Sequence, residues 1–347
     1  MGSHTLKNCF KTYISNFILI CYKSNSEFEK KRLFYRKTDY FMFKKFLRLK
    51  SFMPLFFVLV VQACDQIPNL VSLERSADGK NVSKDQLLVE YYKRLEKRKL
   101  EVGLLRQDGG GADTPFDSED ITQAFEQLAF FNEYSISKSK LETNLTPVLL
   151  AKWNTPINIA TKFGSSVTRK EKNRNLKEIG DFSKNLSEIT DHKIEMSEQN
   201  ANMFVIFGNQ EEVPILIEEI SFLSTQFDTQ KTKVLSKLPK DIQCLAMTSV
   251  KADTNGNIVS ALIIIRSELP TLLKKACIQE EIAQGLGLSN DSHLARPSIF
   301  NDDYEFATLT EFDKILLKIL YDKRLKSGSS FQNSSDIIKQ ISMELEY

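Results

Sequence analysis

The stretch 277–291 carries the side chains with the clearest chemical potential in this sequence. It reads Cys-Ile-Gln-Glu-Glu-Ile-Ala-Gln-Gly-Leu-Gly-Leu-Ser-Asn-Asp. On a helix of 3.6 residues per turn, Cys277, Glu281 and Gln284 share one face, and Glu280 lies on its flank. Two adjacent carboxylates repel each other, so a partly buried one can have a raised pKa and act as a general acid or base. The competing interpretation is that one or both glutamates are exposed charges.

A helix over 271–288 must hold this polar row, and it is expected to end in a glycine turn. Ile278, Ile282 and Leu286 fall on the opposite face, which we expect to meet a sheet. Strands are predicted over 153–162, 191–198, 201–207, 244–251 and 258–266. Further helices are predicted over 84–99, 118–134, 170–189, 214–222 and 309–321. This order of helices and strands indicates an α+β fold.

The charge of the chain is unevenly distributed along its length. Residues 1–63 carry 12 Lys+Arg and 3 Asp+Glu, out of 47 and 45 in the whole sequence. Residues 64–347 therefore carry 35 and 42, a net charge of −7. Proteins that bind nucleic acids need clustered Lys and Arg to neutralise phosphates. An acidic body therefore argues against a nucleic-acid partner.

Residues 42–63 have the layout of a bacterial secretory signal, with a basic start and an apolar run over 52–61. The following Val-Gln-Ala-Cys resembles the lipobox of bacterial lipoproteins. That resemblance implies cleavage before Cys64, a lipid on Cys64 and a tether over 64–82. The competing interpretation is a transmembrane helix, but spanning a membrane needs about 20 apolar residues.

The lipid anchor implies a location in the bacterial cell envelope, facing the periplasm. Asp65 follows the candidate lipid cysteine, which in some bacteria favours the inner membrane. Residues 1–41 fit no part of a signal peptide. They are interpreted as an over-extended gene start or, alternatively, as a cytoplasmic extension.

Five cysteines occur, and none of them forms a Cys-x-x-Cys pair, which argues against a zinc knuckle or a redox motif. If the working protein begins at Cys64, only Cys244 and Cys277 remain as free thiols. Outside the cytoplasm, a disulfide between these two is favoured. The alternative is that Cys277 is a metal ligand or a nucleophile beside Glu281.

The stretch 277–291 resembles a segment of an uncharacterised bacterial lipoprotein family, domain of unknown function 2927. Its members carry Cys-x-x-Glu-Glu-x-x-Gln-x-Leu-Gly-Leu-x-Asn-Asp and, downstream, Ser-Ile-Phe-Asn-Asp, which stands here at 298–302. Similarity extends to Asp108-Gly-Gly-Gly111, Phe125, Glu133-Tyr134 and 153–157. The resemblance implies a zincin-like domain over 83–347, with a small twisted mixed sheet packed on a central helix and N-terminal helices over 83–150. It brings no activity with it.

The frame of the same helix is similar to that of metzincin-type zinc peptidases, which place His-Glu-x-x-His on a helix and a third His after a glycine turn. The corresponding positions here are Glu280, Glu281, Gln284, Gly287 and Asn290. Glu281 stands where the catalytic glutamate would be, but all three histidines are replaced. Zinc prefers nitrogen and sulfur ligands, and amides are poor ones. Zinc is therefore not expected, and the identity of any other cofactor stays open.

Three functions follow from these observations. The favoured one is a non-catalytic module that binds a peptide, a glycan or an envelope protein, because the zinc ligands are lost. The second is a divergent hydrolase of an envelope peptide or glycan, with Glu281 as general base. The third is an altered metal site that uses oxygens suited to calcium or magnesium. Its candidate ligands are Glu280, Glu281, Gln284, Asn290 and Asp291.

Overall fold

The central strands have two apolar faces, and this alternation determines how the helices are arranged. In β6 (Met203–Gly208) all residues are buried, and odd-numbered side chains such as Val205 join one apolar core. Even-numbered side chains such as Ile206 join a second core on the other face. Side chains alternate across a strand, so a sheet with apolar residues on both faces must be covered by helices on both.

The computed structural model describes residues 84–137, 140–223, 235, 238–251 and 256–345. Lys80–Tyr347 forms a compact unit of its own. The predicted extension, signal peptide and tether, including Cys64, lie outside the described residues. None of the helices in the described ranges is long and apolar enough to cross a membrane.

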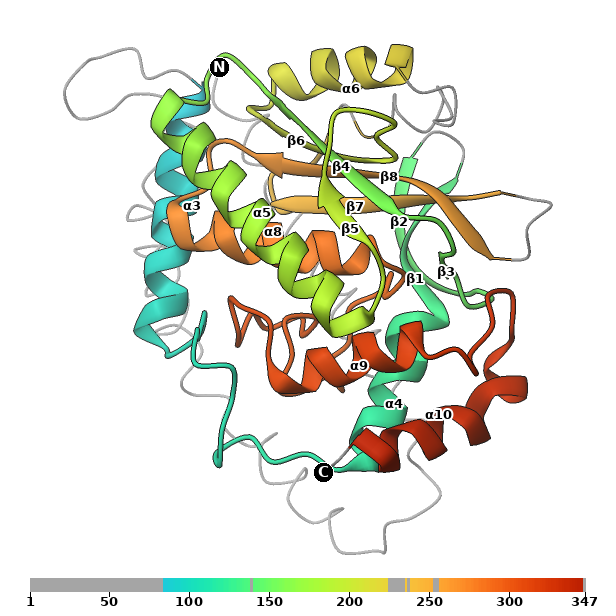
Figure 1. The fold of residues 1–347 in the computed structure, drawn as a ribbon. Coiled ribbons are helices and arrows are strands. Elements are labelled where there is room, and N and C mark those ends of the chain that lie inside the picture. Colours follow the sequence, from blue (N-terminus) through green and yellow to red (C-terminus); the bar gives the residue numbers. More distant parts are fainter. Residues whose placement is uncertain (1–83, 138–139, 224–234, 236–237, 252–255, 346–347) are drawn as a thin grey trace, which may run out of the picture. The chain divides into compact units, whose positions relative to one another are not determined.

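The main sheet has six strands in the order β3-β8-β6-β4-β5, with β7 pairing to β8 (Figure 1). The pairing of β7 with β8 is antiparallel, and the other four pairings are parallel. The mixed sheet predicted from sequence is therefore confirmed, although it is larger and more parallel than expected. The bounds are β3 (Lys152–Trp153), β4 (Ile157–Phe163), β5 (Ile194–Met196), β7 (Cys244–Val250) and β8 (Asn257–Arg266).

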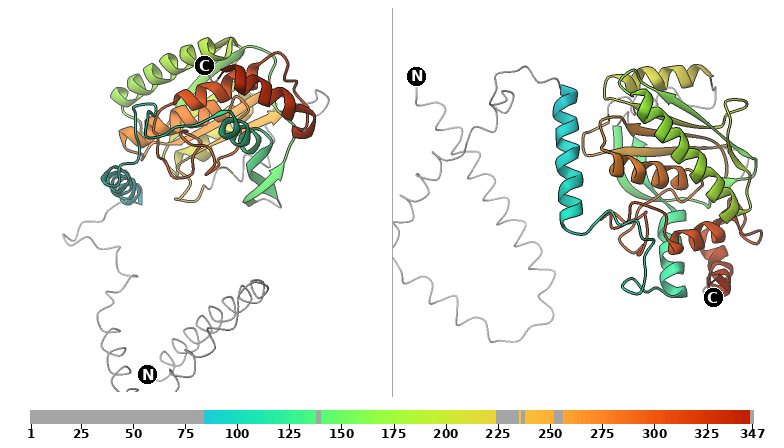
Figure 2. Two further views of the ribbon diagram at one scale, coloured as in Figure 1. Left: turned by 90° about the horizontal axis from the view of Figure 1, so that it is seen from below. Right: turned by 60° about the vertical axis from the view of Figure 1, so that its left-hand side comes forward.

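Helices α5 (Arg169–Thr190) and α8 (Thr271–Gln284) lie on one side of the sheet, and α6 (Glu212–Leu223) lies on the other (Figure 1). The remaining helices are α3 (Lys84–Glu101), α4 (Ser118–Ala129), α9 (Glu311–Tyr321) and α10 (Phe331–Leu345). Helices α4, α9 and α10 pack together at the end of the molecule far from α6 (Figure 2). The larger apolar core lies between this group, α8 and the sheet.

Local sequence signals explain why most helices begin where they do. Thr168 caps α5, and Glu171 reaches back to it in a capping box. Ile179, Phe182 and Leu186 follow at helical spacing and are all buried, which confirms the predicted helix. At α4 the cap is Asp117, which forms a capping box with Asp120.

Two predicted helices end earlier than expected. The helix expected over 118–134 ends at Ala129, and Phe131–Ser137 forms β1, which pairs antiparallel with β2 (Lys140–Pro147). This pairing is a tertiary contact that the helical spacing of apolar residues could not reveal. The helix expected over 271–288 ends at Gln284, since Gly285 caps it and Gly287 adopts a φ of 130°.

Candidate functional site

Helix α8 is enclosed along most of its length. Every residue from Ala276 to Gln284 is buried. Glu280 retains only 7% of its surface and Glu281 only 5%. The alternative that these glutamates are exposed charges is therefore excluded. Carboxylates are rarely buried without a partner, so their surroundings are the first place to search for a site.

The polar row of α8 lies against the edge strand β7. A disulfide joins Cys277 to Cys244 of β7, with the two Cα atoms 5.9 Å apart. The next turn of α8 follows the same strand, because the backbone N–H of Ala246 donates to the Glu281 carboxylate. The disulfide predicted from sequence is confirmed, and Cys277 is therefore not a free nucleophile. The expectation that this row faces away from the sheet is wrong, because β7 extends the sheet beneath it.

Four carboxylates gather around this row. Glu280 and Glu281 come from α8, Asp291 follows the turn after α8, and Glu133 comes from β1. Burial raises the pKa of all four carboxyls, and repulsion from neighbouring acids, Asp302 among them, raises the pKa further. The pKa of Glu133 reaches about 7, although the Tyr134 hydroxyl donates to it and lowers the pKa. The site therefore holds an acid cluster that resists full ionisation.

The amide side chains of the predicted site are used as hydrogen-bond donors. Gln284 Nε2 donates to Asp291 Oδ1 over 2.6 Å, which brings these two predicted residues together. Asn290 is 1% exposed, and its Nδ2 donates over 2.9 Å to the backbone carbonyl of Gln127 in α4. The Asn290 amide nitrogen is thus engaged with α4 rather than with the carboxylates.

Two acceptor oxygens at this site lack a hydrogen-bond partner. Oε2 of Glu281 is buried and unpartnered. One carboxylate oxygen each of Glu280 and Glu281 lies within 4.8 Å of the other and of the Cys244 sulfur. Gln243, whose Nε2 donates to the Tyr304 hydroxyl, also has a buried, unpartnered Oε1.

Cations are scarce around the acid cluster. Within the described ranges, none of the four carboxylates has a Lys, Arg or His partner at ion-pair distance. Lys99 is a basic residue that interacts electrostatically with Glu280. Its Nζ lies 4.0 Å above the ring of Tyr304. Burial and the neighbouring carboxylates raise the pKa of the Tyr304 hydroxyl, so this group also stays neutral.

Sequence reasoning missed Glu133 and Tyr304 as members of the site. Glu133 was expected in a helix, but it lies where the pairing of β1 with β2 shifts register. Such irregularities re-aim side chains. The usable signal was the Glu133-Tyr134 pair, which was one of the points of resemblance noted in the sequence. Tyr304 adopts a φ of 58° just after the Ser-Ile-Phe-Asn-Asp motif, and no local pattern marked it.

The Ser-Ile-Phe-Asn-Asp motif forms a turn that side-chain hydrogen bonds hold in place. Ser298 Oγ donates to Asp313 of α9 over 2.5 Å, and it accepts from the backbone N–H of Phe300 over 2.9 Å. Asn301 Nδ2 donates to the carbonyl of Ala295 over 3.0 Å. The exposed Asp302 at its end adds negative charge near Glu280. The motif thus acts on the acid cluster electrostatically, through Asp302.

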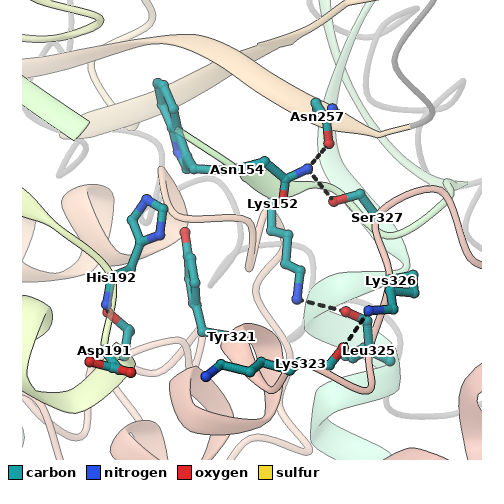
Figure 3. Close-up of a pocket in the computed structure, with 12 residues that line it drawn as sticks. Lys152, Asn154, Asp191, His192, Asn257, Tyr321, Lys323, Leu325, Lys326 and Ser327 are labelled. Atoms are coloured by element: carbon teal, nitrogen blue, oxygen red, sulfur yellow. Dashed lines mark hydrogen bonds between the residues drawn. The ribbon is translucent and has the colours of Figure 1, made fainter. Parts of the chain in front are cut away.

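A separate pocket of about 480 Å³ opens between β3, the end of α5 and the segment after α9 (Figure 3). His192 lies beside Tyr321, with ring centroids 5.0 Å apart, and its Nε2 is 2.9 Å from the carbonyl of Thr155. Lys152, Lys323 and Lys326 also line this pocket. Ligand pockets have volumes of roughly 300–1,000 Å³, so a small molecule or a peptide side chain fits here.

Comparisons with known proteins add one finding. No curated protein and no solved structure matches the chain significantly. A family described as "Protein of unknown function (DUF2927)" matches residues 118–340, which is more than half of the 347 residues. The matched segment contains β1, α8 and the turn after it, and therefore the whole acid cluster. The chain belongs to the DUF2927 family.

Proposed function

We propose that this protein is a lipid-anchored envelope module that binds a partner and does not catalyse a reaction. The observation that carries the proposal is the enclosure of Glu281, which is 5% exposed and lies beside a disulfide. A general base must come within hydrogen-bond reach of the proton that it removes. The enclosed Glu281 side chain offers a substrate no such approach.

The donor set does not fit zinc. The positions that hold histidine in metzincins are Glu280, Gln284 and Asn290, which offer oxygens in place of the imidazole nitrogens that zinc prefers. His192 lies in the pocket of Figure 3, and His293 is exposed. In the described part of the chain, neither histidine reaches the Glu281 carboxylate. A zincin-like ancestry with a lost zinc site accounts for this combination.

The proposed compartment is the periplasmic face of the cell envelope, with the inner membrane favoured. The Cys244–Cys277 disulfide supports it, because disulfides persist in oxidising compartments. The anchor would be a lipid on Cys64. Replacing Cys64 by Ser in the full chain should move the protein from the membrane fraction to the soluble periplasmic fraction. Retention of the variant in membranes would contradict the anchor.

The pocket in Figure 3 is the proposed contact with the partner, a peptide, a glycan or an envelope protein. Lys326 lies on its rim, so a photo-reactive amino acid at position 326 should cross-link an envelope component in cells. Position 97 on α3 is the matched control, since Lys97 has a side-chain exposure of 77% and lies outside the pocket. Equal adducts at both positions would contradict the pocket as the binding site.

Catalysis is the outcome that would overturn the proposal as a whole. The full chain should release no products from casein or peptidoglycan, and it should purify without stoichiometric zinc. Product release that Glu281→Gln abolishes would instead establish a divergent hydrolase with Glu281 as its base.

A further inference from the structure

The acid cluster places four carboxyl groups inside the protein, and the described residues around it provide no basic partner at ion-pair distance. Glu133, Glu280, Glu281 and Asp291 repel one another. Buried charges are ordinarily paired or bound to a metal ion. Among the described residues, the ion pair on the same row of α8 lies in its first turns, where Lys274 Nζ is 3.2 Å from Glu171. That pair is remote from Glu281 in the helix by two turns.

The unpartnered Oε2 of Glu281 identifies where a ligand is needed. A buried acceptor without a partner carries its full desolvation cost, on the order of 1–3 kcal/mol. The described residues contain one other carboxylate oxygen of this kind, Oε2 of Glu268. Glu268 has the guanidinium of Arg266 at 3.9 Å, whereas the charged groups that act on Glu281 are the acids Glu133 and Asp291. Glu281 therefore lacks the cation that its counterpart has.

The donor atoms around Glu281 select the chemistry of the missing ligand. Carboxylate oxygens suit hard cations such as calcium, magnesium and manganese. The one sulfur nearby, that of Cys244, is bound in a disulfide and cannot act as a thiolate ligand. Calcium accepts six to eight oxygens in flexible arrangements, among them those of waters, so the carboxylates of Glu280 and Glu281 can form the core of such a site.

We propose that the acid cluster binds one hard divalent cation, with Glu280 and Glu281 as its ligands and Glu133 and Asp291 as the acidic groups around them. The cation would give Glu281 Oε2 a partner and offset the charge of the carboxylates that ionise. This site is independent of the proposed partner-binding pocket and of lipid anchoring.

The test is a titration of the full chain after removal of divalent cations with a chelator. Isothermal calorimetry with calcium, magnesium or manganese chloride should show one cation per chain. The same cation should raise the melting temperature until the site saturates, because only the folded chain holds the site. No heat and no thermal shift with any of the three salts would overturn the proposal.

Two conservative variants locate the site. Glu133→Gln and Asp291→Asn lie on different segments, and neither residue is fully buried, so at least one should fold. Each should weaken cation binding by about tenfold or more. The matched control is Glu311→Gln on α9, whose side chain is 72% exposed and which should bind like the unchanged protein. Equal affinity in the control and in a folded cluster variant would place the cation elsewhere and overturn the proposal.

Discussion

A single buried lysine donates hydrogen bonds to backbone carbonyls at the C-terminal end of α9. Lys152 Nζ donates to the carbonyls of Leu320, Asp322 and Leu325 over 2.9, 3.2 and 2.7 Å. The last carbonyls of a helix have no partner within the helix, and they carry partial negative charge. One ammonium group therefore satisfies three acceptors at a helix C-terminus, in a residue that is only 7% exposed.

Removing this ammonium group should destabilise the protein. Lys152→Met keeps the apolar stem but removes three hydrogen bonds, while the Asp322 carbonyl keeps the backbone N–H of Leu325 as a donor. We therefore expect the free energy of unfolding to fall by on the order of 3 kcal/mol. Urea unfolding measures the change. Lys97→Met, at an exposed position on α3, should stay within about 0.5 kcal/mol of the unchanged protein. Similar losses in both variants would show that the three hydrogen bonds contribute nothing specific.

The same lysine predicts a stability change at alkaline pH. Burial, and then the charge of Lys326, lower the pKa of Lys152 from 10.5 to about 8. Between these values the unfolded chain binds more protons than the folded chain, so the free energy of unfolding rises with pH. One group contributes at most about 1.4 kcal/mol per pH unit. Lys152→Met should reduce this rise, and an unchanged slope in the variant would assign it to Lys99 and Lys274, whose pKa values burial also lowers.

The glycine turn after α8 permits a close backbone contact. A Cβ atom on Gly287 would lie 2.2 Å from the carbonyl oxygen of Ala151, and the φ of 130° is unfavourable for other residues. Gly287→Ala should therefore cost about 3 kcal/mol or more. Gly103 is the matched control, since it has a φ of 81° with no atom within 4 Å of the added Cβ. Its substitution should cost about 1 kcal/mol, and equal melting temperatures for the two variants would refute the steric argument.

At the scale of elements, local patterns predicted those whose signals are local. Helix α5 was predictable because a capping box precedes apolar residues at helical spacing. Strands β7 and β8 were predictable from their apolar content and from the glycine at 256 between them. The hairpin of β1 and β2 was not, because Phe131 and Tyr134 fit a helical pattern equally well. Only the pairing with residues 140–147 decides whether this segment forms a helix or a strand.

The prediction of the candidate site had the same limit: residues close together in sequence were found, and residues from distant segments were not. Glu280, Glu281 and Asp291 lie close in sequence, so one motif revealed them together. Glu133 approaches from β1 and Tyr304 from the turn before α9, and these placements depend on tertiary structure. The burial of the α8 polar row was also hidden, because the polar residues of a helix ordinarily face solvent. Strand β7, at the edge of the sheet, covers this row instead.

The covalent link between α8 and β7 should contribute measurably to stability. Cys244 and Cys277 are separated by 33 positions, and closing a loop of that length stabilises a protein by about 3–4 kcal/mol in the chain-entropy description. We expect the double variant Cys244→Ala, Cys277→Ala to lose that amount in urea unfolding. Reduced wild-type protein should behave like the variant. A variant as stable as the oxidised protein would show that packing alone holds α8 against β7.

At the scale of the molecule, the apolar cores of the described residues lie after residue 80. The residues of both apolar cores all lie between Leu88 and Leu345, and Lys80–Tyr347 is a compact unit. A chain that begins at Lys80 should therefore unfold cooperatively, with a melting temperature within about 4 °C of the full chain, which corresponds to less than about 1 kcal/mol. Calorimetry of the two proteins is the measurement. A broad transition in the shorter chain would assign a structural role to the preceding residues.

The position of the Cys244–Cys277 bridge also determines how it can be made and broken. Thiol–disulfide exchange needs an attacking thiolate, and it releases a second one. Glu280 and Glu281 lie beside the Cys244 sulfur, and Cys277 is fully buried, so both anions would form against carboxylates and away from water. An oxidoreductase can therefore exchange this bridge only while α8 is undocked. Oxidation must precede the last packing step of folding, and the folded protein then resists exchange with thiols in its surroundings.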